Sequence, residues 1–340
     1  MGSMEQRIIK ALNPDLSADD CALVEHGGQP YLYTTDGMAE GSHFRLDWST
    51  PEDIAHKLIG INLSDLMAGG GEPEFCLLNV GIPDPSQGRE DIQIEEFIER
   101  FGERLRMLLK ENGCQLVGGD TFRSAQFLFS LTLSGPALYP RMRRAAAGDG
   151  LYISGSVGLS RLGYDMLSSE GRPDRMDLDQ LCQAKERSGD ASRNEENQGQ
   201  ATAAAAGGEL SGRAFCKHLR PWPNLQAARS LNGLQTHHFP VHGSMDLSDG
   251  IFSDCQRFAE SCGLDLKVDL DSLPLPSGIK DPLYAASSGE ELEFLASSAE
   301  PIPGWIRIGS FQQPHSTPTV EFLRNGKSVQ GKAYYEHFQD

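Results

Sequence analysis

The chain has 340 residues and a formal net charge of −18, so it is long enough for two domains with hydrophobic cores. So acidic a chain argues against a nucleic-acid or anionic-membrane surface as its main partner. It contains no run of 18 apolar residues and no signal-peptide pattern, and its seven cysteines are dispersed without a Cys-x-x-Cys pair. We therefore expect a cytoplasmic protein whose thiols are reduced.

The first candidate site residues lie near the N-terminus. Asp19 and Asp20 directly precede an apolar run. Adjacent carboxylates repel each other, so an ordered pair needs a cation or a basic neighbour, although a solvated turn fits these residues equally well. The aromatic and β-branched run 31–35 then predicts a strand that ends at Asp36, and the following loop carries His43. A plain Asp-Gly turn is the other interpretation of this strand end.

A helix is predicted to begin after Thr50, because Thr50 is a good N-cap and Pro51 suits the first turn. The helix runs toward Gly69, and its apolar residues Leu58, Ile61 and Ala68 share one stripe with Asp65. A carboxylate on a buried face must be paired, hydrogen-bonded or bound to a metal. The alternative is a frayed helix end that exposes Asp65.

A second helix is predicted over 92–112, followed by a strand that stops at Gly118, Gly119 and Asp120. The glycines allow a ligand to approach the backbone closely, and Asp120 supplies negative charge. Residues 135–150 are expected to form a domain junction. They carry three arginines that suit either a phosphate site or a solvated basic turn, namely Arg141, Arg143 and Arg144.

The segment 170–212 is polar and partly of low complexity, so we expect a modest helix near 178–186 followed by a disordered insertion. Beyond it, Asp246, Ser248 and Asp249 precede a helix with an apolar stripe. They act either as helix caps or as a carboxylate–hydroxyl–carboxylate set on a metal. A glycine turn follows at Ser288-Gly289-Glu290, and the tail carries Tyr335 among other aromatic residues.

So many aspartates at predicted strand ends, helix starts and glycine turns indicate a site for several hard cations. Mg²⁺ with oxygen ligands and few histidines is typical of nucleotide chemistry. No Walker A loop is present, because Glu321 stands where the motif before Gly326-Lys327-Ser328 requires its first glycine. The residues alone therefore predict a Mg²⁺-dependent phosphoryl-transfer or ATP-binding enzyme without a P-loop.

The order of these motifs resembles the thiamine-monophosphate kinase family, within the superfamily that includes aminoimidazole ribonucleotide synthetase. Each motif is weak alone, but their order is specific and spans nearly the whole chain outside the insertion. The matching blocks are Asp19-Asp20, Thr34-Thr35-Asp36 with Glu40-Gly41-Ser42-His43-Phe44, Asn62-Leu63-Ser64-Asp65-Leu66, Gly118-Gly119-Asp120-Thr121, Asp246-Leu247-Ser248-Asp249-Gly250, Ser288-Gly289-Glu290 and His337-Phe338.

The resemblance implies a two-domain α+β/α/β fold. Residues 4–138 would form an N-terminal α/β domain that holds the metal and ATP site and pairs through its sheet in a homodimer. Residues 139–340 would form a C-terminal α/β domain, with the insertion at 170–212.

The implied reaction transfers the γ-phosphoryl group of ATP to thiamine monophosphate, giving thiamine diphosphate, with Mg²⁺ as cofactor. No covalent nucleophile is expected, because positioning and charge neutralisation dominate this chemistry. The implied metal ligands are Asp19, Asp20, Thr35, Asp36, Asp65, Asp120, Asp246 and Asp249. The implied ATP-binding residues are Gly119, Asp120, Arg144 and Ser248, and the implied substrate-binding residues are His43, Glu290 and Tyr335.

The chain departs from the family pattern at three places. Leu16-Ser17-Ala18 replaces a Gly-x-Gly before the paired aspartates, Leu292 replaces a tyrosine, and the loop after Arg144 lacks Arg-Pro-Gly. A related ATP-dependent enzyme with another phosphorylated acceptor is therefore one alternative, and a non-catalytic nucleotide-binding homologue is another. A selenophosphate-forming relative would need a reactive N-terminal cysteine, whereas Cys21 lies inside an apolar run.

Overall fold

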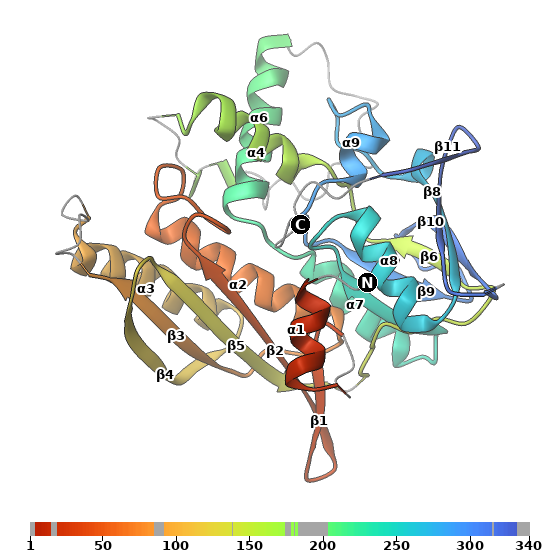
Figure 1. Cartoon of the computed structure of the whole chain (residues 1–340), viewed down its shortest axis with the longest axis horizontal. Helices are drawn as coiled ribbons and strands as arrows, with labels where there is room; N and C mark the ends of the chain where they lie inside the picture. The colour runs from red at the N-terminus through yellow and green to blue at the C-terminus, as the bar shows by residue number, and fades with distance from the viewer. Residues whose placement is uncertain are drawn as a thin grey trace.

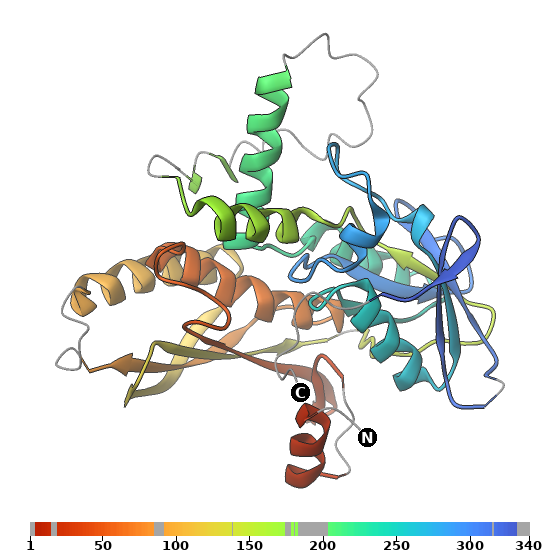
Figure 2. The same cartoon turned by 45° about the horizontal axis from the view of Figure 1, so that its top comes forward.

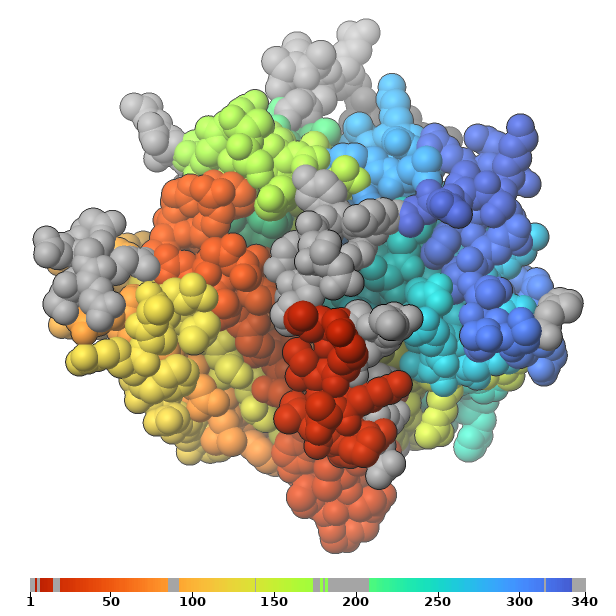
Figure 3. All heavy atoms as spheres, viewed as in Figure 1, coloured from red at the N-terminus to blue at the C-terminus, as the bar shows by residue number. Residues whose placement is uncertain are grey.

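A computed structural model describes residues 4–14, 19–84, 92–137, 139–173, 178–179, 181–182, 203–314 and 316–331. The described chain builds two separate sheets, one from its N-terminal half and one from its C-terminal half. Figure 1 and Figure 3 show these halves side by side, orange to yellow on the left and cyan to blue on the right. Among the described helices, none combines the length and apolar character that a membrane span requires.

The N-terminal sheet has five strands in the order β1-β2-β5-β3-β4, and α2 and α3 pack on one of its faces (Figure 1). The β1–β2 hairpin projects from the body, and every β1 residue is exposed. The elements of this half are α1 Met4–Leu12, β1 Ala22–His26, β2 Gln29–Ala39, α2 Pro51–Ala68, β3 Phe75–Pro83, α3 Ile94–Glu111, β4 Gln115–Ser124 and β5 Leu128–Pro136.

The C-terminal sheet has seven strands in the order β12-β11-β8-β10-β6-β9-β7. Figure 2 shows α6 standing out from the body, with its C-terminal end at the junction of the two halves. The elements are β6 Gly150–Ile153, α4 Leu159–Glu170, α6 Ala203–Leu219, α7 Leu225–Gln235, β7 Val241–Asp246, α8 Ile251–Cys262, β8 Asp265–Asp269, the 3₁₀ turn η3 Leu270–Ser272, α9 Pro282–Ala286, β9 Phe294–Ser298, β10 Ile306–Gln312, β11 Val320–Arg324 and β12 Lys327–Val329.

Helix α2 lies between the two halves and is buried on most of its surface. Its predicted start is confirmed. The Thr50 hydroxyl accepts from the Asp53 N–H at 3.3 Å, and the Asp53 carboxylate accepts from the Thr50 N–H at 3.0 Å, which completes a capping box. Leu58 and Leu63 pack into the N-terminal core, while Ser64 and Met67 face the C-terminal half.

Two predicted strands are longer in the structure than in the sequence analysis. The strand expected to end at Asp36 continues to Ala39, and the strand expected to stop at Gly118 continues to Ser124. Glycine does not favour a strand by itself, but hydrogen bonds to a neighbouring strand extend both strands past their glycines. Strand β2 pairs with β5, and β4 pairs with β3. Asp36 and Asp120 therefore lie within strands.

Part of the predicted insertion is helical. Residues 203–212 belong to α6, whose alanines and leucine favour helix. The predicted helix near 178–186 lies mostly outside the described residues, but Leu178 is buried and Asp179 forms ion pairs with Arg104 and Arg220. The expectation that all thiols are reduced is wrong in this structure, because Cys182 and Cys216 form a disulfide with a Cα–Cα distance of 5.9 Å.

We expect Gly60→Ala to lower the free energy of unfolding by about 1–3 kcal/mol, because the structure leaves no room for a methyl group on α2. A Cβ at Gly60 would lie 2.3 Å from the carbonyl oxygen of Pro221. Gly102→Ala in α3 is the matched control. Its Cβ would meet only the flexible end of Arg106 at 3.3 Å, so it should stabilise by about 0.5–1 kcal/mol. Urea unfolding of both variants measures the change in the free energy of unfolding, and equal changes in the two variants would contradict the prediction.

Candidate active site

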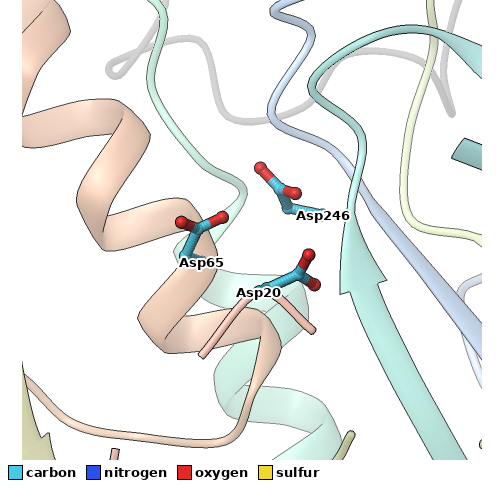
Figure 4. Close-up of side chains that lie close together, drawn as sticks. All are labelled: Asp20, Asp65 and Asp246. Carbon is cyan, nitrogen blue, oxygen red and sulfur yellow. The ribbon is translucent and has the colours of Figure 1, made fainter. Parts of the chain in front are cut away.

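Three aspartates from distant parts of the sequence converge where the two halves meet. Oxygen atoms of Asp20, Asp65 and Asp246 lie within 4.8 Å of one another. Figure 4 shows Asp65 on α2, Asp246 at the end of β7 and Asp20 between them, all turned toward one point. The structure thus brings together three of the predicted metal ligands.

Each carboxylate of this aspartate cluster is held by a neighbouring side chain. The Thr34 hydroxyl donates to Asp65 at 2.7 Å, and the Ser64 hydroxyl donates to Asp246 at 2.8 Å. Arg143 forms an ion pair with Asp20. Because Ser64 and Asp65 are adjacent on α2, this one helix fixes both its own carboxylate and the carboxylate from the other half.

The cluster is electrostatically unfavourable without a cation. Burial, and then the negative charges of Asp36, Asp246 and Asp20, raise the pKa of Asp65 well above its usual value. Burial and the charge of Asp20 likewise raise the pKa of Asp246 well above its usual value. One oxygen of Asp20, Oδ2, is buried without a hydrogen-bond partner among the described residues. An all-oxygen donor set with an orphaned acceptor fits a hard divalent cation such as Mg²⁺.

The metal-free protein should lose thermal stability as the pH rises above about 4, the usual pKa of an aspartate. Carboxyl groups with a raised pKa bind protons more tightly in the folded state, so their contribution to stability is complete below about pH 4. That contribution is lost as the pH passes through the raised folded-state pKa. Millimolar Mg²⁺ should restore most of the loss. The check is a series of melting temperatures in EDTA and in Mg²⁺, and two flat, identical profiles would contradict it.

The loop that follows Asp246 is organised by Asp254, which the sequence analysis did not single out. Its fully buried Oδ2 accepts from the backbone N–H groups of Ser248, Asp249 and Gly250 at 3.0–3.1 Å. Its Oδ1 lies 3.3 Å from Arg257, which also pairs with Asp249. Asp254 lies one helical turn after the N-cap Gly250. An aspartate at this spacing can accept from the backbone N–H groups at the helix start, and this was the sequence signal that could have identified it.

Of the other predicted metal ligands, Asp19 and Asp36 lie beside the cluster. Asp19 accepts from the backbone N–H of Arg143 at 3.2 Å, next to Asp20. The charge of Asp36 acts on Asp65, and the Asp36 N–H donates to Asn62 at 3.2 Å. Thr35 is exposed on β2, where its hydroxyl accepts from Thr132 at 3.1 Å.

Gly119 and Asp120 lie apart from the cluster within one chain. They belong to β4, the edge strand of the sheet, and both are exposed. Since β5 and β3 separate β4 from β2, three strand spacings, roughly 14 Å, lie between Asp120 and the strand that carries Asp36. A Cβ at Gly119 would lie 1.8 Å from the carbonyl oxygen of Leu78, so this glycine serves the close pairing of β3 and β4.

The three arginines of the junction have separate roles. Arg141 is buried and donates to Ser244 at 3.0 Å and to Gln235 at 2.9 Å, so it joins β7 to the end of α7. Arg143 neutralises Asp20. Arg144 is exposed. For Arg141, burial excludes the solvated basic turn that was the alternative to a phosphate site.

The predicted substrate residues His43 and Glu290 meet at Lys57, which the sequence analysis missed. Lys57 donates to the His43 carbonyl oxygen at 2.8 Å and lies 2.6 Å from a Glu290 carboxylate oxygen. Tyr335 lies outside the described residues.

The comparison with known proteins first defines the class. The family model described as "AIR synthase related protein, N-terminal domain" matches residues 18–137. The fold is that of a solved structure described as "AaThiL complexed with AMPPCP and TMP", with a TM-score of 0.74 and 24% identity, covering 99% of both chains. The two-domain aminoimidazole ribonucleotide synthetase-like fold implied by the sequence is thereby confirmed.

Curated relatives narrow the class to one family. The chain is 35% identical to the thiamine-monophosphate kinase of Leptospira interrogans, over 98% of this chain and 97% of the relative. It is 26% identical to the thiamine-monophosphate kinase of Aquifex aeolicus, over 97% and 95% of the two chains. The chain belongs to the thiamine-monophosphate kinase family, whose members are phosphotransferases, and the resemblance noted in the sequence is confirmed.

Proposed function

We propose that this chain transfers the γ-phosphoryl group of ATP to the phosphate of thiamine monophosphate, giving thiamine diphosphate, at the aspartate cluster between its two halves. Family membership supports the reaction, and the convergence of Asp20, Asp65 and Asp246 is the observation that carries the placement. A solved structure of the same fold is described as holding AMPPCP and TMP together.

The aspartate cluster would hold Mg²⁺, which supplies neutralisation of the negative charge on the reacting phosphates. The chain's own part is to bring ligands from both halves to fixed positions, through Thr34, Ser64 and Arg143. The nearest thiol is no nucleophile. Cys21 is buried, its Sγ lies 3.4 Å from the Asp65 carbonyl oxygen, and burial and nearby carboxylates raise its pKa well above the usual value.

The remaining sequence-predicted residues keep the roles that the resemblance implies, as part of this proposal. Asp19, Asp36 and Asp249 would complete the ligands of the aspartate cluster together with Thr35. Asp120, which lies apart from the cluster within one chain, would contribute from a second copy of the chain. Gly119, Asp120, Arg144 and Ser248 would contact ATP. His43, Glu290 and Tyr335 would contact thiamine monophosphate.

We also propose a homodimer formed by the N-terminal sheet, and domains at 4–138 and 139–340. The face near the edge strand β4 supports the dimer, because it exposes the apolar side chains of Leu77, Leu116, Val117 and Phe122, each 43–59% accessible. We expect Val117→Asp to shift the protein toward a monomer in light scattering after gel filtration. Lys110→Asp, on the opposite side of the sheet, is the control. A wild-type monomer at high micromolar concentration would refute the dimer.

The decisive experiment measures ADP release with ATP and Mg²⁺, with and without thiamine monophosphate, and identifies thiamine diphosphate as product. Product that depends on Mg²⁺ supports the proposal. ATP binding without thiamine diphosphate would reject this acceptor and favour another phosphorylated one, to be sought by screening phosphorylated metabolites. Binding of ATP without turnover on any acceptor would favour a non-catalytic nucleotide-binding homologue.

A further inference from the structure

Lys57 is a buried cation that joins the two halves of the molecule. It lies on α2, two helical turns before Asp65, and is 4% exposed. Its ammonium group donates to the His43 carbonyl oxygen at 2.8 Å and contacts Glu290 at 2.6 Å. A buried lysine needs such partners, because an uncompensated charge in the interior is costly.

Glu290 belongs to a strained turn that is held by its contacts. Glu290 and Leu292 both have positive φ, at 55° and 48°, in a region that residues other than glycine avoid. The Glu290 N–H donates to the Ser248 carbonyl oxygen at 2.6 Å, and the Leu292 N–H donates to that of Leu247 at 3.0 Å. The turn is therefore bonded along its backbone to the segment that carries Asp246 and Asp249.

The charge on Glu290 depends on Lys57. Burial by itself would raise the pKa of Glu290, but the adjacent Lys57 ammonium outweighs it and the pKa is lowered from its usual value. His218 lies 3.9 Å from the other carboxylate oxygen. Burial and the Lys57 charge lower the pKa of His218 to about 4, so this imidazole is neutral near pH 7. Lys57 is thus the charged partner that keeps Glu290 in place.

These contacts form a continuous path from α2 to the far side of the aspartate cluster. Helix α2 supplies Asp65 directly, and through Lys57 and Glu290 it also supports the backbone of Ser248. We propose that Lys57 is a positioning residue that sets the Asp246–Asp249 segment against Asp65, so that the metal site assembles only when this ion pair is formed. The inference rests on the proposed metal site and assigns Lys57 no contact with substrate.

The test measures metal binding, so that it does not depend on turnover. Mn²⁺ titrated into the full chain and followed by electron paramagnetic resonance gives the dissociation constant. We expect Lys57→Met to weaken Mn²⁺ binding about tenfold or more, as loss of a residue that supports metal ligands does elsewhere. Lys57→Arg should recover part of the affinity, because it keeps the charge. The Mg²⁺ concentration needed for half-maximal activity should rise in parallel.

Lys217→Met is the matched control. Lys217 is also buried, at 6% exposure, and lies 3.8 Å from Glu293, but no hydrogen bond or ion pair in the described structure joins it to Glu290 or Ser248. It should lower the melting temperature without weakening Mn²⁺ binding. The double variant Lys57→Met with Glu290→Gln removes the uncompensated charge and should recover melting temperature without recovering affinity.

The outcomes separate this inference from the proposed function. A folded Lys57→Met protein with wild-type Mn²⁺ affinity would overturn the inference, as would equal weakening by Lys217→Met. Weakened Mn²⁺ binding in Lys57→Met supports it, even if the wild type forms no thiamine diphosphate, which would reject the proposed reaction alone. Wild-type protein that binds no Mn²⁺ would overturn both the metal site and the role of Lys57.

Discussion

Asp65→Asn should lower the rate of thiamine diphosphate formation by on the order of 10²–10³-fold, the largest effect expected from any single substitution described here. Asparagine keeps the shape and the hydrogen bond from Thr34 but removes the charge that a cation would share with Asp20 and Asp246. Steady-state assays at saturating ATP and Mg²⁺ measure the effect. Asp246→Asn should behave alike, because Asp246 lies in the same cluster.

The same substitution should make the metal-free protein more stable. Removing one of three mutually repelling carboxylates relieves part of the repulsion that raises the pKa of the others. The melting temperature of Asp65→Asn in EDTA should therefore exceed that of the wild type, and Mg²⁺ should raise it less. Asp271→Asn, an exposed aspartate on η3, is the control and should change neither activity nor melting temperature. Full activity of Asp65→Asn would reject the cluster as the reaction site.

Asp254→Ala should destabilise the protein by about 3–5 kcal/mol and weaken metal binding about 10–100-fold. One fully buried carboxylate oxygen satisfies three consecutive backbone N–H groups, and alanine would leave all three without this acceptor. Each buried donor left unsatisfied costs about 1–3 kcal/mol before the loop relaxes. Urea unfolding and a Mn²⁺ titration measure the two effects separately.

Two further variants test this assignment. Glu260→Ala removes an exposed carboxylate from the same helix and should change stability by less than about 0.5 kcal/mol. Asp254→Asn keeps an acceptor oxygen, so its loss of stability should be intermediate. Burial and the charge of Asp249 raise the pKa of Asp254 to about 7, so its carboxyl is partly protonated near neutral pH. A raised pKa means that the folded wild type gains stability as the pH falls, whereas the Asn variant does not. The penalty of Asp254→Asn should therefore be largest in acid and shrink as the pH rises through about 7. Equal losses for Asp254→Ala and Glu260→Ala would show that the loop is held by other contacts.

The sequence was sufficient for features that depend on near neighbours. The start of α2 was predictable because a capping box needs only Thr50 and Asp53, three residues apart. Helices α3 and α8 were predictable because their apolar residues recur with the period of a helix. The order of short motifs was specific enough to indicate the family, and the relatives confirm it.

Only the tertiary structure decided which carboxylates act together. Ser64 and Asp246 are 182 positions apart, and no local pattern predicts their 2.8 Å hydrogen bond. Asp120 looked equivalent to Asp65 in sequence, yet strand order places it on an exposed edge. Lys57 was missed because its partners are a backbone carbonyl and a glutamate in a distant turn. Asp254 was missed because its partners are backbone N–H groups. Local patterns predict helix starts and apolar periodicity, because these depend on residues close together in sequence. A site depends on distances between remote residues, which only the packed chain establishes.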